Sequence, residues 1–130
     1  MPEIINKEDF LFNSPIIHPA ILIRKEELDK VNNYLDIKRT LRCEDYDLFM
    51  RLYANGCKMY TIQEYLFDYR EDKDCYARRK YKYRIYNMQT RLYGYKLLDL
   101  MPKGYVYAIK PLIVGLIPVK ILNILRHEKI

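Results

Sequence analysis

Arg42-Cys43-Glu44-Asp45-Tyr46-Asp47-Leu48-Phe49-Met50-Arg51-Leu52 carries the clearest structural signal in this chain of 130 residues. Acidic side chains crowd the start of the stretch, where the partial positive charge of a helix N-terminus stabilises them. Apolar side chains then follow at spacings typical of one helical face: Leu48, Phe49, Leu52 and Tyr53. Gly56 is a residue that commonly ends a helix. The stretch therefore predicts a helix over residues 45–55.

Short strands are predicted on both sides of this helix. Upstream, residues 20–24 are apolar and β-branched and predict a strand, and residues 25–33 predict a short helix. Downstream, residues 58–62 and 65–69 predict two short strands around a turn. Short strands interspersed with helices indicate an α+β fold for residues 1–72.

The pattern becomes purely helical from residue 73. Apolar side chains step by four and three residues along a long helix predicted over residues 73–101: Tyr81, Ile85, Met88, Leu92 and Tyr95. Pro102-Lys103-Gly104 ends that helix, and two shorter apolar helices are predicted over 105–116 and 119–127. We therefore divide the chain into residues 1–72 and a basic, amphipathic helical tail, residues 73–130.

Charge is distributed unevenly between these two parts. Residues 1–72 contain 10 Lys and Arg against 14 Asp and Glu, whereas residues 73–130 contain 13 against 3. A basic tail on an acidic body favours an anionic partner for the tail. Its apolar helices could lie on an anionic membrane surface, or they could pack on the rest of the protein or on a second copy of the chain.

Cysteine usage and hydropathy bear on location. Cys43, Cys57 and Cys75 cannot all pair within one chain, and their spacing matches no zinc motif. The N-terminus lacks the basic and apolar segments of a secretory leader. The tail contains no uncharged run approaching the ~20 residues of a membrane span. We therefore expect a cytoplasmic protein, peripheral on the inner face of the membrane if its tail binds lipid.

Short motifs flank the acidic stretch on both sides. It is preceded by Asn13-Ser14-Pro15-Ile16-Ile17-His18-Pro19-Ala20. It is followed by Gly56-Cys57-Lys58-Met59-Tyr60 and then by Glu64-Tyr65-Leu66-Phe67-Asp68-Tyr69-Arg70. This order resembles the C-terminal half of family 2 glycosyltransferases, inverting enzymes of the GT-A type. The resemblance implies the acceptor and base part of a GT-A fold, with a few short strands followed by a helical tail. It also implies hexosyl transfer from a nucleotide-sugar to a glycan or lipid-linked acceptor, in surface polysaccharide assembly.

The resemblance assigns roles to four residues. Asp45, with Glu44 beside it, corresponds to the carboxylate that deprotonates the acceptor hydroxyl. His18 lines the acceptor side of the cleft, and Arg70 faces the donor diphosphate. The chain departs from the family after this arginine, where Glu71-Asp72-Lys73-Asp74 weakens the phosphate role. Plainer interpretations are acids stabilised at a helix N-terminus, a structural histidine and an exposed arginine at a strand end.

A donor-binding half is not recognisable in the chain. In this family an N-terminal half holds the nucleotide, and its Asp-x-Asp pair binds Mg²⁺ or Mn²⁺ against the diphosphate. Here Asp45-x-Asp47 lies inside the base motif, and no Gly-rich phosphate loop occurs. We therefore expect this chain alone to hold no metal and to be inactive. The chain also has no Trp and so lacks the Gln-x-x-Arg-Trp element of processive members, which favours single-sugar transfer.

Functions of other classes remain open. A non-catalytic interaction module or subunit derived from a glycosyltransferase would explain the missing donor half, and an exposed sheet edge would invite a homodimer. Lys and Arg are interleaved with Tyr over residues 76–95, a pattern that can bind nucleic acid. The acidic body and the absence of a nucleic-acid motif argue against that function.

Overall fold

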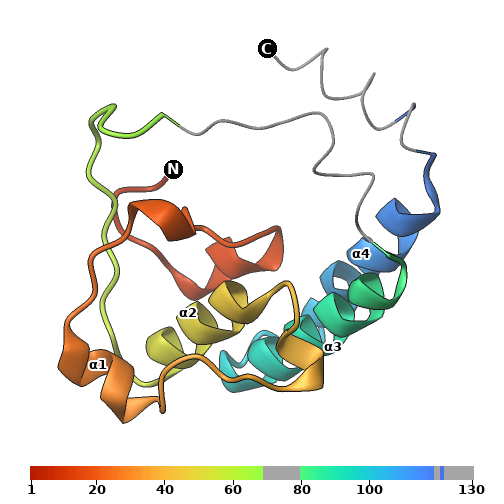
Figure 1. Ribbon diagram of the computed structural model, residues 1–130, viewed down its shortest axis with the longest axis horizontal. Helices are drawn as coiled ribbons and strands as arrows, with labels where there is room; N and C mark the ends of the chain where they lie inside the picture. Colours follow the sequence, from red (N-terminus) through yellow and green to blue (C-terminus); the bar gives the residue numbers. More distant parts are fainter. Residues whose placement is uncertain (69–79, 119–120, 122–130) are drawn as a thin grey trace.

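Helices make up the regular structure of the part of the chain that the structure describes. The computed structural model describes residues 1–68, 80–118 and 121, and in these ranges α-helices and short 3₁₀ helices alternate with loops (Figure 1). The elements follow in the order η1 (Lys7–Leu11), η2 (His18–Ala20), α1 (Lys25–Lys30), η3 (Lys38–Thr40), α2 (Glu44–Ala54), α3 (Lys82–Leu97) and α4 (Gly104–Leu116). Figure 1 shows α2 between α1 and the pair formed by α3 and α4.

Helix α2 forms the centre of the hydrophobic core. Leu48, Phe49 and Met50 are at most 1% exposed. The chain turns after the helix at Gly56, whose φ of 85° is a left-handed conformation that glycine adopts without strain. The helix predicted over residues 45–55 is confirmed, and α2 begins and ends one residue earlier.

Helices α3 and α4 form an antiparallel pair (Figure 1). A Cβ atom placed on Gly104, at the start of α4, would lie 2.9 Å from the Tyr95 ring. One placed on Gly115, near the end of α4, would lie 3.1 Å from the Tyr81 ring. The two glycines therefore allow close contact between the helices at both ends of α4.

A polar cluster inside the core ties the N-terminal segment to α2 and α3. Arg91 is 4% exposed and donates to the carbonyl oxygen of Leu11 at 3.2 Å and to the Tyr95 hydroxyl at 2.8 Å. The Tyr46 hydroxyl of α2 donates to the carbonyl oxygen of Phe10. Because these buried polar groups satisfy one another, they fix η1 against both helices without an unpaired donor.

The α+β prediction is wrong for the described residues, which contain no β-strand and do not show the strands of a GT-A fold. Residues 20–24 have extended backbone at Ile21 and Arg24 but pair with no neighbouring segment. The strands predicted over 58–62 and 65–69 are likewise absent up to residue 68, and one isolated antiparallel bridge joins Ile4 to Tyr60. A strand needs a partner's backbone groups, and an apolar, β-branched pattern does not reveal whether that partner is present.

The helices predicted in the tail are confirmed where the structure describes them. Helix α3 lies within the range predicted as 73–101, and α4 begins one residue before the range predicted as 105–116. The apolar row of α3 is buried only toward its C-terminal end. Tyr95 is fully buried, whereas Tyr81 is 45% exposed and Ile85 is 38% exposed.

Some predictions fall on residues that the structure does not describe. These are the boundary between residues 72 and 73, the proposed diphosphate ligand Arg70, and all but one residue of the helix over 119–127. They stay predictions. Within the described ranges, no helix combines the length and apolar character needed to cross a lipid bilayer.

Candidate active site

The acidic pair Glu44 and Asp45 occupies the first turn of α2. Both carboxylates lie where the helix N-terminus stabilises negative charge. Glu44 is exposed, and the Asp45 side chain is 33% exposed. Asp45 Oδ1 accepts the backbone N–H of Tyr46 at 2.8 Å. The other carboxylate oxygen, Oδ2, is therefore the one that faces neighbouring side chains.

His18 lies beside this carboxylate although it comes from a different segment. It is the first residue of η2. Its Nδ1 atom lies 4.0 Å from Asp45 Oδ2, which is within ion-pair distance but longer than a hydrogen bond. The imidazole also packs edge-on against Phe49, with 6.1 Å between ring centroids. Because Phe49 is fixed in the core, it holds the histidine ring on the same side of α2 as Asp45.

Tyr34 completes the group. Its hydroxyl lies 2.8 Å from His18 Nε2. Partial burial raises the pKa of Tyr34, and the negative charges of Asp45 and Glu44 raise it further. The hydroxyl therefore stays protonated at neutral pH and is able to donate a hydrogen bond. We refer to Asp45, His18 and Tyr34 as the Asp45 cluster.

A buried ion-pair network holds the loop that carries Tyr34. The fully buried Asp47 carboxylate pairs with Arg39 Nη1 at 2.5 Å and with Arg51 Nε at 2.7 Å. Arg51 Nη2 also donates to the carbonyl oxygen of Asn33 at 2.8 Å. Since Asn33 directly precedes Tyr34, one helix positions both the carboxylate and the tyrosine of the Asp45 cluster.

The described residues do not offer a metal site. Among them, no three His, Cys, Asp or Glu side chains gather closely enough to hold an ion. The Asp45-x-Asp47 pair cannot chelate one, because Asp47 is enclosed by Arg39 and Arg51 whereas Asp45 faces the surface. The divalent cation that the resemblance implies does not fit these residues.

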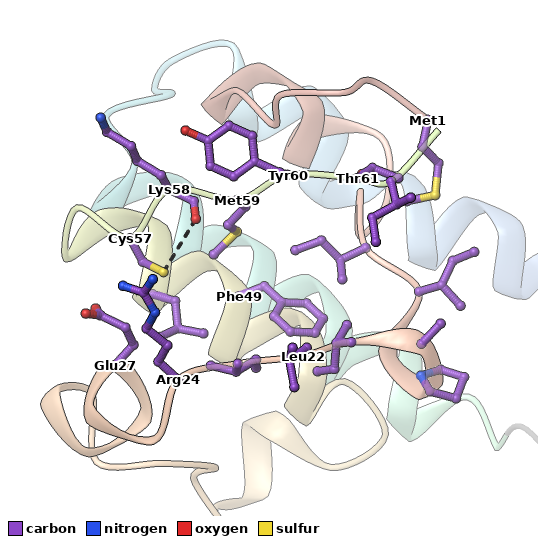
Figure 2. A pocket seen from close by; sticks show the side chains of 18 of the residues that line it. Met1, Leu22, Arg24, Glu27, Phe49, Cys57, Lys58, Met59, Tyr60 and Thr61 are labelled. Atoms are coloured by element: carbon purple, nitrogen blue, oxygen red, sulfur yellow. Dashed lines mark hydrogen bonds between the residues drawn. The ribbon is translucent and has the colours of Figure 1, made fainter. Parts of the chain in front are cut away.

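Residues on both sides of His18 in the sequence line an open groove of about 1340 Å³, whose lining is mixed polar and apolar (Figure 2). The segment from residue 16 to 24 lines one side, and residues 55–67 line the other. Figure 2 shows Phe49 between Leu22 and Met59. Phe49 therefore lines the groove and also contacts the His18 ring of the Asp45 cluster.

The structure brings together two of the four residues predicted from the sequence. Asp45 and His18 are neighbours, and Glu44 is exposed beside them. Arg70 lies outside the described residues. Tyr34 is not predicted as a site residue from the sequence. No local sequence pattern marks a tyrosine in a polar loop as functional, and Tyr34 meets His18 only when its loop and η2 come together in the fold.

Comparisons with known proteins point to one class. EpsE of Bacillus subtilis (strain 168), which carries the name of a glycosyltransferase, is 34% identical over 116 residues, covering 89% of this chain and 41% of EpsE. The UDP-Gal:alpha-D-GlcNAc-diphosphoundecaprenol beta-1,3-galactosyltransferase of Escherichia coli is 31% identical, covering 72% of this chain and 41% of the enzyme. MJ1057 of Methanocaldococcus jannaschii, named an uncharacterized glycosyltransferase, is 29% identical over 65% of this chain and 28% of its own length.

The chain is thus a relative of proteins named as glycosyltransferases, the class that its motifs resemble. It spans about two fifths of the length of EpsE and of the E. coli galactosyltransferase. No protein-family model matches the chain. No solved structure matches it significantly.

Proposed function

We propose that this chain is the acceptor and base part of an inverting glycosyltransferase of family 2. The complete enzyme would transfer a hexosyl group from a nucleotide-sugar to a glycan or lipid-linked acceptor. The observation that carries this proposal is the Asp45 cluster: a partly exposed carboxylate with His18 Nδ1 4.0 Å from its Oδ2 atom. The names of the relatives support the same class. The name of the E. coli relative includes a diphosphoundecaprenol-linked acceptor, and we extend that acceptor class to this chain.

Asp45 is the general base in this proposal. Inverting transfer requires the acceptor hydroxyl to lose its proton as its oxygen attacks the anomeric carbon of the donor sugar. The bond from that carbon to the diphosphate breaks, and the nucleoside diphosphate leaves with the bonding electrons. Asp45 Oδ2 receives the proton, because Oδ1 already accepts the N–H of Tyr46. No step of this chemistry passes through a metal held by the described residues.

His18 and Tyr34 orient this base. A neutral imidazole has one donor nitrogen and one acceptor nitrogen. Nδ1 faces the Asp45 carboxylate, which only accepts, so the ring proton is favoured on Nδ1. Nε2 is then free to accept from the protonated Tyr34 hydroxyl at 2.8 Å. In this arrangement Tyr34 sets the tautomer, and His18 presents an N–H dipole to the carboxylate.

The remaining site residues have roles at the substrate. Glu44 is exposed beside Asp45 and offers a second carboxylate to hydroxyl groups of the acceptor sugar. His18, through its partly exposed ring, also lines the acceptor side. Arg70 contacts the diphosphate, as the family resemblance implies. Binding of the nucleotide and of Mg²⁺ or Mn²⁺ is assigned to the donor half of the complete enzyme, and we expect this chain alone to be inactive.

The experiment is a substitution in the native gene, which tests the protein at whatever length it is made. Asp45→Asn keeps the size of the side chain and removes its basicity. Asp29→Asn is the matched control, because Asp29 is an exposed acid on α1 that pairs with Lys25. Extracts are supplied in turn with radiolabelled UDP-galactose, UDP-glucose and UDP-N-acetylglucosamine, and label is counted in lipid and glycan fractions. The proposal predicts that Asp45→Asn abolishes a transfer that Asp29→Asn retains.

A non-catalytic subunit is the second candidate. Such a subunit, derived from a glycosyltransferase, keeps the similarity to proteins named glycosyltransferases without catalysis by this chain. A subunit that only completes or regulates a partner does not need the Asp45 carboxylate. If Asp45→Asn and Asp29→Asn both retain full transfer, a non-catalytic subunit becomes the favoured function of this chain.

A further inference from the structure

Helix α4 presents an apolar face that no described residue covers. Its members recur at spacings of one, three and four residues, which places them along one side of the helix: Tyr105, Val106, Ile109, Ile113 and Leu116. Their exposed fractions run from 47% at Ile109 to 74% at Val106 and Leu116. The buried residues of the same helix, Gly104, Ala108 and Pro111, lie on the opposite side. An exposed apolar stripe of this length indicates a surface that binds a partner.

The segment that carries this face has an excess of positive charge. Within residues 80–118 the acidic side chains are limited to Asp99, whereas basic side chains outside the core are Lys80, Lys82, Arg84, Lys96, Lys103 and Lys110. Lys103 directly precedes α4. Lys110 directly follows Ile109 in the same helix. Basic groups therefore lie beside the N-terminal half of the apolar face.

We infer that the exposed face of α4, defined by the five apolar residues above, binds the surface of an anionic lipid bilayer. Apolar side chains enter the region between headgroups and acyl chains, and the lysines beside them attract anionic headgroups. Tyr105 and Tyr81, both about half exposed, suit the boundary between water and lipid. A second copy of the chain fits less well, because it would bring another excess of positive charge against this one.

This binding does not depend on the assignment of Asp45 as a base. It deepens the proposed function in one respect, since a chain held on a bilayer lies beside acceptors that are anchored in it. The two proposals can be tested independently. A result that excludes lipid binding by α4 does not bear on Asp45 as the base, and a result that excludes Asp45 as the base does not bear on lipid binding.

The test is co-sedimentation of the 130-residue chain with vesicles. One set contains phosphatidylcholine with phosphatidylglycerol, and the other contains phosphatidylcholine alone. The variant Val106→Glu/Leu116→Glu places charges at two side chains that are each 74% exposed, so the fold should tolerate it. Leu66→Glu is the matched control, because Leu66 is 68% exposed and lies outside α4. Circular dichroism establishes that all variants keep their helix content.

The inference predicts binding to the anionic vesicles that weakens with added salt and is at least about tenfold weaker to phosphatidylcholine alone. It also predicts that Val106→Glu/Leu116→Glu lowers the anionic binding by about tenfold or more, while Leu66→Glu does not. Absence of binding to anionic vesicles overturns it, as does an equal loss in the Leu66 control. Sedimentation velocity supplies a further outcome: a dimer of the unmodified chain that the double variant dissociates assigns the face to a second copy and also overturns it.

Discussion

His18 Nδ1 and Asp45 Oδ2 lie 4.0 Å apart, although η2 and α2 are separated in sequence by α1 and η3. Two features of the core produce this approach. Phe49 packs against the His18 ring, and the Asp47 pairs with Arg39 and Arg51 anchor the intervening loop to α2. The contact between His18 and Asp45 is therefore a product of tertiary packing. A carboxylate that only stabilised the N-terminus of α2 would not require a histidine beside it.

The tautomer of His18 tests the role proposed for Tyr34. We expect nitrogen-15 NMR at pH 8 to show the Nδ1–H form in the unmodified chain and a shift toward Nε2–H in Tyr34→Phe, because the variant cannot donate to Nε2. The chain has two histidines, so His127→Gln identifies the His18 signals. Tyr105→Phe, an exposed tyrosine on α4, is the control. The same tautomer in all forms would remove Tyr34 from the proposed mechanism.

The buried Asp47 network predicts a large loss of stability on Asp47→Asn. The variant leaves Arg39 and Arg51 without their anionic partner in a site where the Arg51 side chain is 9% exposed. Breaking a buried pair in this way costs about 3–5 kcal/mol of unfolding free energy. The exposed Asp29→Asn change should cost about 1 kcal/mol or less. Urea denaturation measures both, and equal small losses would contradict the network's structural role.

Close packing between α2 and α3 predicts a second sensitive position, Gly94. A Cβ atom there would lie 2.1 Å from Met50 Sδ and 3.2 Å from Met50 Cβ, and Met50 is fully buried. Gly94→Ala should therefore lower the unfolding free energy by about 1–3 kcal/mol through overpacking.

The Gly94 prediction is checked with a double-mutant cycle in Met50→Ala. Removing most of the methionine side chain should make Gly94→Ala less costly than it is in the unmodified chain. Additive effects of the two substitutions would show that the methionine is not what excludes a larger residue at position 94.

Burial of Cys43 predicts a pH dependence of stability. Burial is the main cause that raises the pKa of this thiol to about 11, so the folded state favours its neutral form more strongly than the unfolded chain does. The resulting stability is present below the ordinary thiol pKa and is lost as pH rises from about 9 through about 11. Urea unfolding at pH 8 and pH 10.5 should show a steeper decline in the unmodified chain than in Cys43→Ala. Equal declines of the unfolding free energy in the two proteins would contradict the pH dependence predicted from Cys43.

Local signals in the sequence predict the helices but not the absence of strands from the described residues. The α2 helix follows from acids in its first turn, an apolar face and Gly56, all of which act within a few residues. The apolar pattern of residues 20–24 also predicts local extension, and the backbone at Ile21 and Arg24 is extended. Strand pairing, however, depends on a partner segment, which no local pattern specifies.

The difference between local sequence patterns and tertiary contacts also explains which residues of the candidate site can be predicted. Asp45 and Glu44 are recognisable because they stand at a helix start within a family-like motif. His18 is recognisable from its motif, but its distance to Asp45 is not. The role of Tyr34 depends on the chain reversal at Asn32 and Asn33, which adopt positive φ values of 58° and 57°. The sequence therefore predicts the residue that we propose as the base, whereas the neighbours that we propose to orient it follow only from the tertiary structure.

The rate of sugar transfer by the native protein carrying Asp45→Asn is the decisive measurement of whether Asp45 is the base. Against the Asp29→Asn control, and at equal amounts of folded protein, we expect a rate lower by about 10²–10⁴-fold, the contribution typical of a general base. Equal rates in the two variants would show that Asp45 is not the base, because the transfer would then proceed without its carboxylate.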